Sequence, residues 1–289
     1  MTHAPAPGSL EDRYARDGFV ILDGVLDHAE TDALLAETVA ICRGGRGPID
    51  GADTAPVPPG TSDDDLLRRF LCVHYPHKMS PLMRDTIRHP GLVEPLTRVV
   101  GPNVKAMQSM LFIKSEGRPG QAWHQDEGFI PTRDRSLTAA WIALDDATTE
   151  NGCLWVVPGS HRPGVLYPDR EHDDPRYDCT VESYGFPWTE DDAVPVELKA
   201  GSALLFNGYL LHKSLPNTGA HGCRRALVGH YMSAESPLPW EPPPAGVGMA
   251  RADFRDIVLV AGRDPYAWKG TEDVRRPRVR PDRDGGCDR

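Results

Sequence analysis

Three absences narrow what this chain can be. Its six cysteines are dispersed and include no Cys-x-x-Cys pair, which argues against a zinc knuckle or a disulfide framework and favours free thiols in a reducing cytosol. No apolar run approaches the roughly 18 residues that a membrane-spanning helix needs. Acidic residues outnumber basic ones by 42 to 32, and the net charge of −10 argues against binding to nucleic acid.

The first residues lack an apolar segment as well. Thr2–Ser9 is rich in proline and alanine, so no secretory signal is expected. We therefore predict a cytoplasmic protein with no nucleic-acid, membrane or partner-protein interaction.

Helix signals are confined to the first hundred residues. Ser9 with Asp12, and Asp27 with Glu30, each have the spacing of a capping box at a helix start. Ser80-Pro81 predicts a further short helix, because serine caps and proline suits the first helical position.

Three stretches have no regular pattern. Residues 1–8 and 275–289 are expected to be flexible tails, the second because Arg275–Arg283 is a basic run interleaved with proline. Residues 43–65 are rich in Gly, Pro and Asp, and a loop of that length predicts either a lid over a site or a disordered segment. The chain as a whole, 1–289, is expected to form a single domain.

From Asn103 onward, turn residues separate runs with strand patterns. Helices first and strands after, without βαβ alternation, predict an α+β fold that is mainly β, an antiparallel jelly-roll sandwich with the N-terminal helices packed on one sheet. The expected strands are Val104–Lys114, Leu137–Leu144, Cys153–Val157, Val194–Leu198, Ala203–Asn207 and Arg224–Ser233.

His124 and Asp126 are candidate metal ligands. In an extended segment, residues two apart project from the same face, so this imidazole and this carboxylate can meet one ion. His212 lies 88 residues later (212 − 124), near a late strand that can neighbour an early one in an antiparallel double sheet. Two His and one carboxylate leave one side of an octahedral metal open and favour a non-haem Fe(II) oxygenase.

The spacing alone is weak, because a second His-x-Asp occurs at His172-Asp173-Asp174. That motif lies in a charged run without strand pattern, which indicates a solvated loop. His124 lies between two strand-like runs instead. The alternative interpretation of His124 is a hydrogen-bonded histidine at a strand end.

Seven short motifs occur in order along the chain. They are Gln108-Ser109-Met110, Trp123-His124-Gln125-Asp126, Ala140-Trp141-Ile142-Ala143-Leu144, Glu150-Asn151-Gly152-Cys153-Leu154, Val157-Pro158-Gly159-Ser160-His161, His212-Lys213-Ser214 and Arg224-Arg225-Ala226. As an ordered set they resemble the phytanoyl-CoA dioxygenase family of Fe(II)/2-oxoglutarate-dependent oxygenases, over roughly Gly18–Ser233.

The resemblance implies a double-stranded β-helix, a cupin-like jelly-roll, with iron and its cosubstrate in the mouth. It implies that His124, Asp126 and His212 are the catalytic metal ligands. Arg224 matches the arginine that grips the far carboxylate of 2-oxoglutarate, a task that suits a planar guanidinium. Arg225 points to the other face and is the alternative if a bulge inverts the register.

Further cofactor-binding residues follow from the same resemblance. Ser214 shares a face with His212 and can donate its hydroxyl to that carboxylate. Gln108 and Met110 are placed along the cosubstrate pocket, and Trp141 forms a wall. For Met110 and Trp141, ordinary core packing is the alternative.

The implied activity is hydroxylation or a related oxidation of a small molecule, using Fe(II), 2-oxoglutarate and O₂ and releasing succinate and CO₂. Asp126 agrees with it, because halogenating relatives have Ala or Gly at that position. The alternatives are a non-catalytic jelly-roll that senses a metal or ligand, and a zinc hydrolase. Residues 43–65 and 166–188 are expected to wall the substrate, and the lack of a basic cluster near them argues weakly against a CoA ester.

Overall fold

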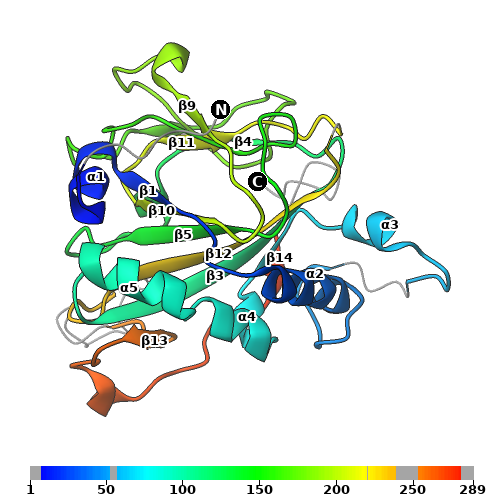
Figure 1. Ribbon diagram of the computed structural model, residues 1–289, viewed down its shortest axis with the longest axis horizontal. Helices are drawn as coiled ribbons and strands as arrows, with labels where there is room; N and C mark the ends of the chain where they lie inside the picture. The colour runs from blue at the N-terminus through cyan, green and yellow to red at the C-terminus, as the bar shows by residue number, and fades with distance from the viewer. Residues whose placement is uncertain (1–7, 53–56, 220, 239–252, 281–289) are drawn as a thin grey trace.

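The computed structural model describes residues 8–52, 57–219, 221–238 and 253–280. Two antiparallel sheets form its centre, and helices from the N-terminal part of the chain cover the outer side of the larger sheet (Figure 1). The smaller sheet lies on the opposite side, at the top of Figure 1. This is the predicted architecture, a mainly β jelly-roll with its helices packed on one sheet.

The predicted capping boxes begin the first two helices. Ser9 Oγ accepts from the backbone N–H of Asp12, and the Asp27 carboxylate accepts from that of Glu30. No helix in the described ranges combines the length and apolar character that crossing a bilayer requires. The α-helices are α1 Leu10–Asp17, α2 His28–Cys42, α3 Asp63–Leu67, α4 Pro81–Thr86, α5 Pro90–Val99 and α6 Asp126–Phe129, and 3₁₀ turns cover Pro76–Lys78, Glu190–Asp192 and Ala267–Lys269.

The larger sheet has the strand order β1-β10-β5-β12-β3-β2-β14, with β13 also paired to β3. Three of its strands have the bounds that the sequence predicted, namely β3, β10 and β12. The strands are β1 Phe19–Leu22, β2 Cys72–His74, β3 Val104–Lys114, β5 Thr138–Ala143, β10 Ala203–Asn207, β12 Arg224–Ser233, β13 Val258–Ala261 and β14 Arg278–Val279.

The smaller sheet has the order β4-β11-β6-β9, and a separate pair joins β7 to β8. Its middle strands come from distant parts of the chain, as a jelly-roll requires. The strands are β4 Gln121–His124, β6 Leu154–Val156, β9 Val194–Val196, β11 His212–Ser214, β7 Asp169–Arg170 and β8 Glu182–Ser183.

Both faces of the larger sheet are buried, and its side chains alternate between two cores. Leu227 and Ile142 pack against the helices, whereas Val228 and Trp141 face the space between the sheets. Alternation with a period of two explains this division, since successive strand residues point to opposite faces. The inner face is therefore the one on which polar side chains can form a site.

The prediction of a flexible tail from residue 275 is wrong for residues 275–280. β14 pairs with β2, and on its other side Asp50 donates to the Pro277 carbonyl and accepts from the Val279 N–H. The open edge of β2 offers unpaired backbone groups, and pairing with them outweighs the poor strand character of an Arg/Pro run.

The other irregular stretches are only partly described. Within 43–65, Asp50 is held on β14 and Ser62 caps α3, while residues 53–56 lie outside the described residues. Closure of this stretch as a lid stays a prediction. Residues 1–7 and 281–289 of the predicted tails are also outside the described part.

Four of the cysteines are free thiols, as the sequence predicted. These are Cys42, Cys72, Cys153 and Cys223. The expectation is wrong for Cys179, which is disulfide-bonded.

Candidate metal centre and cofactor pocket

Two strands of the smaller sheet place two histidines side by side. β4 ends at His124, and His212, at the start of β11, lies directly opposite it in the antiparallel register. Their ring centroids are 4.0 Å apart. Strand pairing thus brings together two imidazoles from distant parts of the chain.

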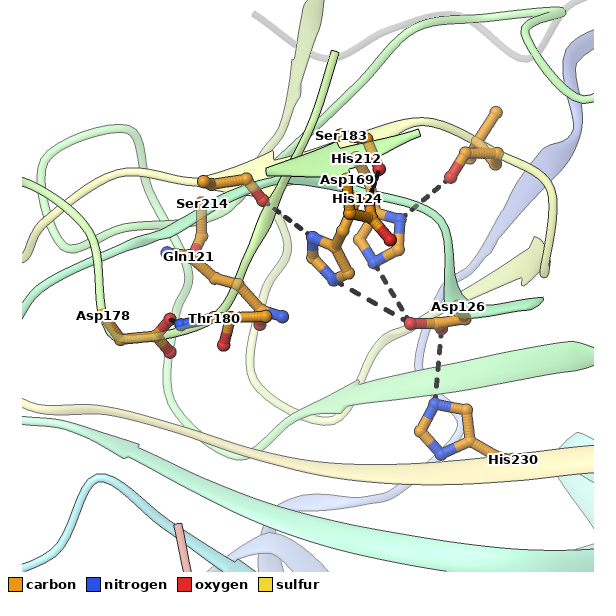
Figure 2. Close-up of polar contacts among 12 residues, drawn as sticks. Gln121, His124, Asp126, Asp169, Asp178, Thr180, Ser183, His212, Ser214 and His230 are labelled. Carbon is orange, nitrogen blue, oxygen red and sulfur yellow. Dashed lines mark hydrogen bonds and ion pairs between the residues drawn. The ribbon is translucent and has the colours of Figure 1, made fainter. Parts of the chain in front are cut away.

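Asp126 completes the group. Gln125 is extended (φ −126°, ψ 125°), and Asp126 begins α6, so the strand geometry ends one residue earlier than the sequence predicted. Asp126 Oδ1 lies 3.8 Å from His124 Nε2 and 3.7 Å from His212 Nε2, and the three ligand atoms are within 4.8 Å of one another. Figure 2 shows both rings turned toward this carboxylate.

Backbone carbonyls fix which ring nitrogen faces the centre. His124 Nδ1 lies 2.8 Å from the Ala122 carbonyl oxygen, and His212 Nδ1 lies 2.9 Å from that of Leu210. A carbonyl only accepts, so each Nδ1 carries the proton and each Nε2 keeps its lone pair. Both Nε2 atoms are therefore available as ligands, in the arrangement common around metal-binding histidines.

The protonation states suit a cation. Burial, together with the neighbouring His212, lowers the pKa of His124 to about 3, so this ring is neutral at neutral pH. Burial raises the pKa of Asp126, but the imidazoles of His212, His230 and His124 outweigh that effect and hold it below its ordinary value. A neutral imidazole and an ionised carboxylate are the forms that bind metal ions.

His230 is a residue that the sequence analysis did not single out. Its Nε2 lies 3.3 Å from Asp126 Oδ2, the carboxylate oxygen on the far side from the two ligand histidines (Figure 2). The signal was present in the sequence, because 224, 226, 228 and 230 share one face of a strand. Once Arg224 is assigned to the inner face, His230 follows it there.

Arg224 and Arg225 point to opposite faces of β12. Arg224 is 2% exposed, its guanidinium lies 5.1 Å from the ring centroid of Trp141, and its Nε and Nη1 have no hydrogen-bond partner among the described residues. Burial lowers its pKa to about 10, so it remains a cation. Arg225 is bound through Nε and Nη2 to both carboxylate oxygens of Asp145 (2.7 Å each). Of the two, only Arg224 can take a new anion.

The hydroxyl of Ser214 is oriented by two donors. Lys114 Nζ donates to Ser214 Oγ (2.8 Å), and the Gln121 backbone N–H donates to it as well (3.2 Å). A hydroxyl has two acceptor sites and one proton, so with both acceptor sites used the proton is left to donate. Burial and the nearby Arg224 cation hold the pKa of Lys114 well below its ordinary value.

These groups line one cavity of about 370 Å³. The predicted pocket residues Gln108, Met110, Trp141, Ser214 and Arg224 all lie on its wall, together with the three candidate ligands, His74 and His230. Gln108 Nε2 lies 3.2 Å from His74 Nδ1.

The outer wall of the cavity differs from the prediction. None of the described residues of 43–65 or 166–188 lines it, whereas Arg275, Arg278 and Arg280 do. The argument against a CoA ester from a missing basic cluster is therefore wrong, because the C-terminal strand supplies one.

The whole arrangement can be compared with known proteins. A family model described as "Phytanoyl-CoA dioxygenase (PhyH)" matches residues 14–226, which is more than half of the sequence. The chain belongs to the phytanoyl-CoA dioxygenase family. The family match includes the three candidate ligands and Arg224, and it ends before β14.

Two relatives within the phytanoyl-CoA dioxygenase family illustrate the extent of the likeness. The "Phytanoyl-CoA dioxygenase" of Arabidopsis thaliana is 35% identical over 164 residues, which is 56% of each chain. "Phytanoyl-CoA dioxygenase domain-containing protein 1" of Danio rerio is 31% identical over 181 residues, 58% of each chain. The matched part thus spans little more than half the length of these relatives.

Solved structures share the fold of this family member at low identity. The non-haem monooxygenase ThoJ, in its apo form, superposes with a TM-score of 0.67 at 23% identity, covering 89% of this chain and 85% of that one. The epimerase SnoN, in complex with Fe³⁺, alpha ketoglutarate and nogalamycin RO, has a TM-score of 0.59 at 23% identity, covering 84% and 93%. Both establish the jelly-roll as a shared fold.

Proposed function

We propose that the protein is an Fe(II)- and 2-oxoglutarate-dependent dioxygenase that hydroxylates or otherwise oxidises a small molecule, with release of succinate and CO₂. One observation carries the proposal. A buried set of two imidazoles and a carboxylate shares a cavity with a buried arginine whose Nε and Nη1 lack partners in the described part of the chain. A metal and a dicarboxylate would satisfy both features at once.

His124, Asp126 and His212 would hold the iron. Two imidazole nitrogens and one carboxylate oxygen on one side of an ion leave the opposite side free, which is the donor set of non-haem Fe(II) oxygenases. SnoN, which shares the fold, was solved with Fe³⁺ and alpha ketoglutarate, and this supports the choice of metal and cosubstrate.

Arg224 and Ser214 would hold the far carboxylate of 2-oxoglutarate. The guanidinium brings two nitrogens, Nε and Nη1, whose N–H groups lack partners among the described residues, and the oriented hydroxyl of Ser214 brings a further donor. Arg224 is buried with its guanidinium over the Trp141 ring, and an ionic hydrogen bond is stronger where water is excluded. Lys114 acts through Ser214 as a positioning residue.

When bound, iron and 2-oxoglutarate supply the oxygen chemistry, and the chain supplies binding, orientation and shielding from water. His230 holds the second oxygen of Asp126, so that the first oxygen faces the two histidines. Met110 and Phe206 add apolar wall. Gln108 lines the same cavity beside His74 and offers an amide to a bound molecule.

The test measures succinate formed from 2-oxoglutarate by the purified chain with Fe(II) and O₂, alone and with a metabolite panel. We expect succinate that a chelator abolishes and that Fe(II), but not Zn(II), restores. Binding of 2-oxoglutarate without succinate under every condition would contradict the proposal and support a non-catalytic sensor.

A further inference from the structure

One end of the cavity is lined by residues that take no part in holding metal or cosubstrate. Arg278 reaches it from β14, and Arg275 and Arg280 reach it from the segments before and after this strand. Arg280 is ion-paired with Asp178, with Nη1 3.4 Å from Oδ2. Arg278 has no acidic partner in the described part of the chain.

Tyr75 fixes the side chain of Arg278. The guanidinium carbon lies 5.3 Å from the Tyr75 ring centroid, a cation–π distance. Tyr75 is 2% exposed and has φ of 59°, a left-handed backbone conformation that is costly for a tyrosine. Strain of this kind persists where the surroundings fix a residue, and it concentrates at binding sites.

Arg278 and Arg224 lie at different ends of the cavity. In the sheet register, Arg278 is opposite His74, His74 is opposite Met110, and Met110 is opposite Val228. Three strand spacings and four residues along β12 therefore separate the two arginines, which puts their backbone positions roughly 20 Å apart. A cosubstrate that extends from Arg224 to the metal leaves Arg278 to a second molecule.

The charges in the cavity indicate that this second molecule carries an anionic group. With the proposed cofactors bound, the positive charges of iron and Arg224 are balanced by Asp126 and the dianionic cosubstrate. Asp178 balances Arg280. Arg278 adds a cation that no described residue neutralises, and an unpaired charge in a partly buried cavity is costly.

We propose that the substrate is a compact molecule with an anionic group, a carboxylate or a phosphate, which Arg278 binds. This inference rests on the proposed function, since it concerns the second ligand of the same site. A guanidinium binds either group through two parallel hydrogen bonds. The cavity, at about 370 Å³, is near the lower limit for ligand pockets and also has to hold the cosubstrate, so the substrate is small.

The experiment uses the full chain loaded with Ni(II) and 2-oxoglutarate, which fills the cofactor end and prevents turnover. Inorganic phosphate and propanoate are titrated separately and followed by calorimetry, with propanamide as the neutral counterpart of propanoate. We expect at least one anion to bind and propanamide not to bind. The anion that binds identifies the group that the substrate carries.

Variants assign the binding to one side chain. Arg278→Gln should weaken anion binding by about tenfold or more, and Arg278→Lys by less, because lysine keeps the charge but loses the planar fork. Arg276→Gln is the matched control, since Arg276 is exposed, lies two residues away and does not line the cavity. Melting temperatures are measured for each, and Arg278→Lys still tests the proposal if Arg278→Gln does not fold.

Two results would overturn the inference. One is the absence of binding by both anions to the loaded wild-type chain, and the other is undiminished binding by the folded Arg278 variants. Failure of Ni(II) or 2-oxoglutarate to bind at the start would count against the proposed function instead, so the two failures are distinguishable.

Discussion

The chain contains the same His-x-Asp spacing twice, in two different environments. His124 and Asp126 are 4% and 8% exposed and face a cavity. In the second motif, the Asp174 side chain is 31% exposed and ion-paired with Arg176, while His172 Nε2 lies 2.8 Å from the Thr180 carbonyl oxygen.

The two motifs differ in whether strand pairing brings a third ligand next to them. Strand β11 brings His212 to the first motif as a third candidate ligand. Among the described residues, His124, Asp126 and His212 form the one group of three that is close enough to share an ion, and the second motif belongs to no such group. In the second motif, Asp174 forms an ion pair with the neighbouring Arg176. Strand pairing and burial, more than spacing, make two side chains into a ligand set.

Removing the acid from each motif tests this comparison most strongly. We expect Asp126→Ala to abolish iron-dependent succinate formation, because two imidazoles alone lack the carboxylate of the ligand set. Asp174→Ala should leave turnover close to wild type, since Asp174 does not line the cavity and contacts the Arg176 guanidinium and backbone N–H instead. Loss of activity in Asp174→Ala alone, with a normal melting temperature, would reverse the assignment.

Arg224 and Arg225 offer a similar comparison within one strand, because one lies in the cavity and the other is paired with Asp145. Arg224→Ala should raise the KM for 2-oxoglutarate roughly a hundredfold, because one charge-assisted hydrogen-bonding pair contributes about 3 kcal/mol. Arg225→Ala should leave this KM unchanged and lower the melting temperature, because Asp145 loses its partner. Steady-state kinetics and thermal unfolding of both variants separate the two roles, and the opposite pattern would exchange them.

His230 sharpens the comparison further, because it contacts the acid of the first motif, whereas Arg176 is ion-paired with the acid of the second. His230→Ala should weaken iron binding by about 10–100-fold, the usual cost of losing a group that orients a ligand. The KM for 2-oxoglutarate should change little, and His230→Gln should recover part of the affinity. His221→Gln, at an exposed histidine, is the control for metal titration. Equal iron affinity in wild type and His230→Ala would rule out this role.

Burial also changes the pKa of a histidine outside the cavity, His77, with a smaller expected effect on the protein. Burial, with Lys78 adding to it, lowers the pKa of His77 from 6.5 to about 4. Between these values the unfolded chain binds the proton more readily, so stability is lost as the pH falls through this window. His77→Gln should reduce the decline of the free energy of unfolding from pH 6.5 to 4.5 by about 1–3 kcal/mol. Urea unfolding at several pH values measures it, and parallel curves would contradict it.

Much of the fold could be predicted because its signals are local. The capping boxes at Ser9 and Asp27 depend on residues three positions apart, and β3 and β12 follow from strand-like runs of consecutive residues. The inner-face residues of β12 follow from a period of two once Arg224 is placed.

The features that sequence patterns did not predict depend on contacts between residues far apart in the chain. β14 forms because β2 has an open edge, although 204 residues separate Arg278 from His74 (278 − 74), and nothing in an Arg/Pro run indicates that edge. The helical turn at Asp126 was missed as well, because the His-x-Asp spacing was interpreted for an extended segment. The arginines on the cavity wall, Arg275, Arg278 and Arg280, were missed for the same reason as β14.

The position of β14 in the chain has an evolutionary consequence. Arg275, Arg278 and Arg280 lie beyond residue 226, where the family match ends, yet they line the same cavity as the candidate ligands. Sequence changes at these three positions could alter which small molecule binds there while the candidate metal ligands and Arg224 stay unchanged. Directed evolution of ligand choice would begin at the same positions.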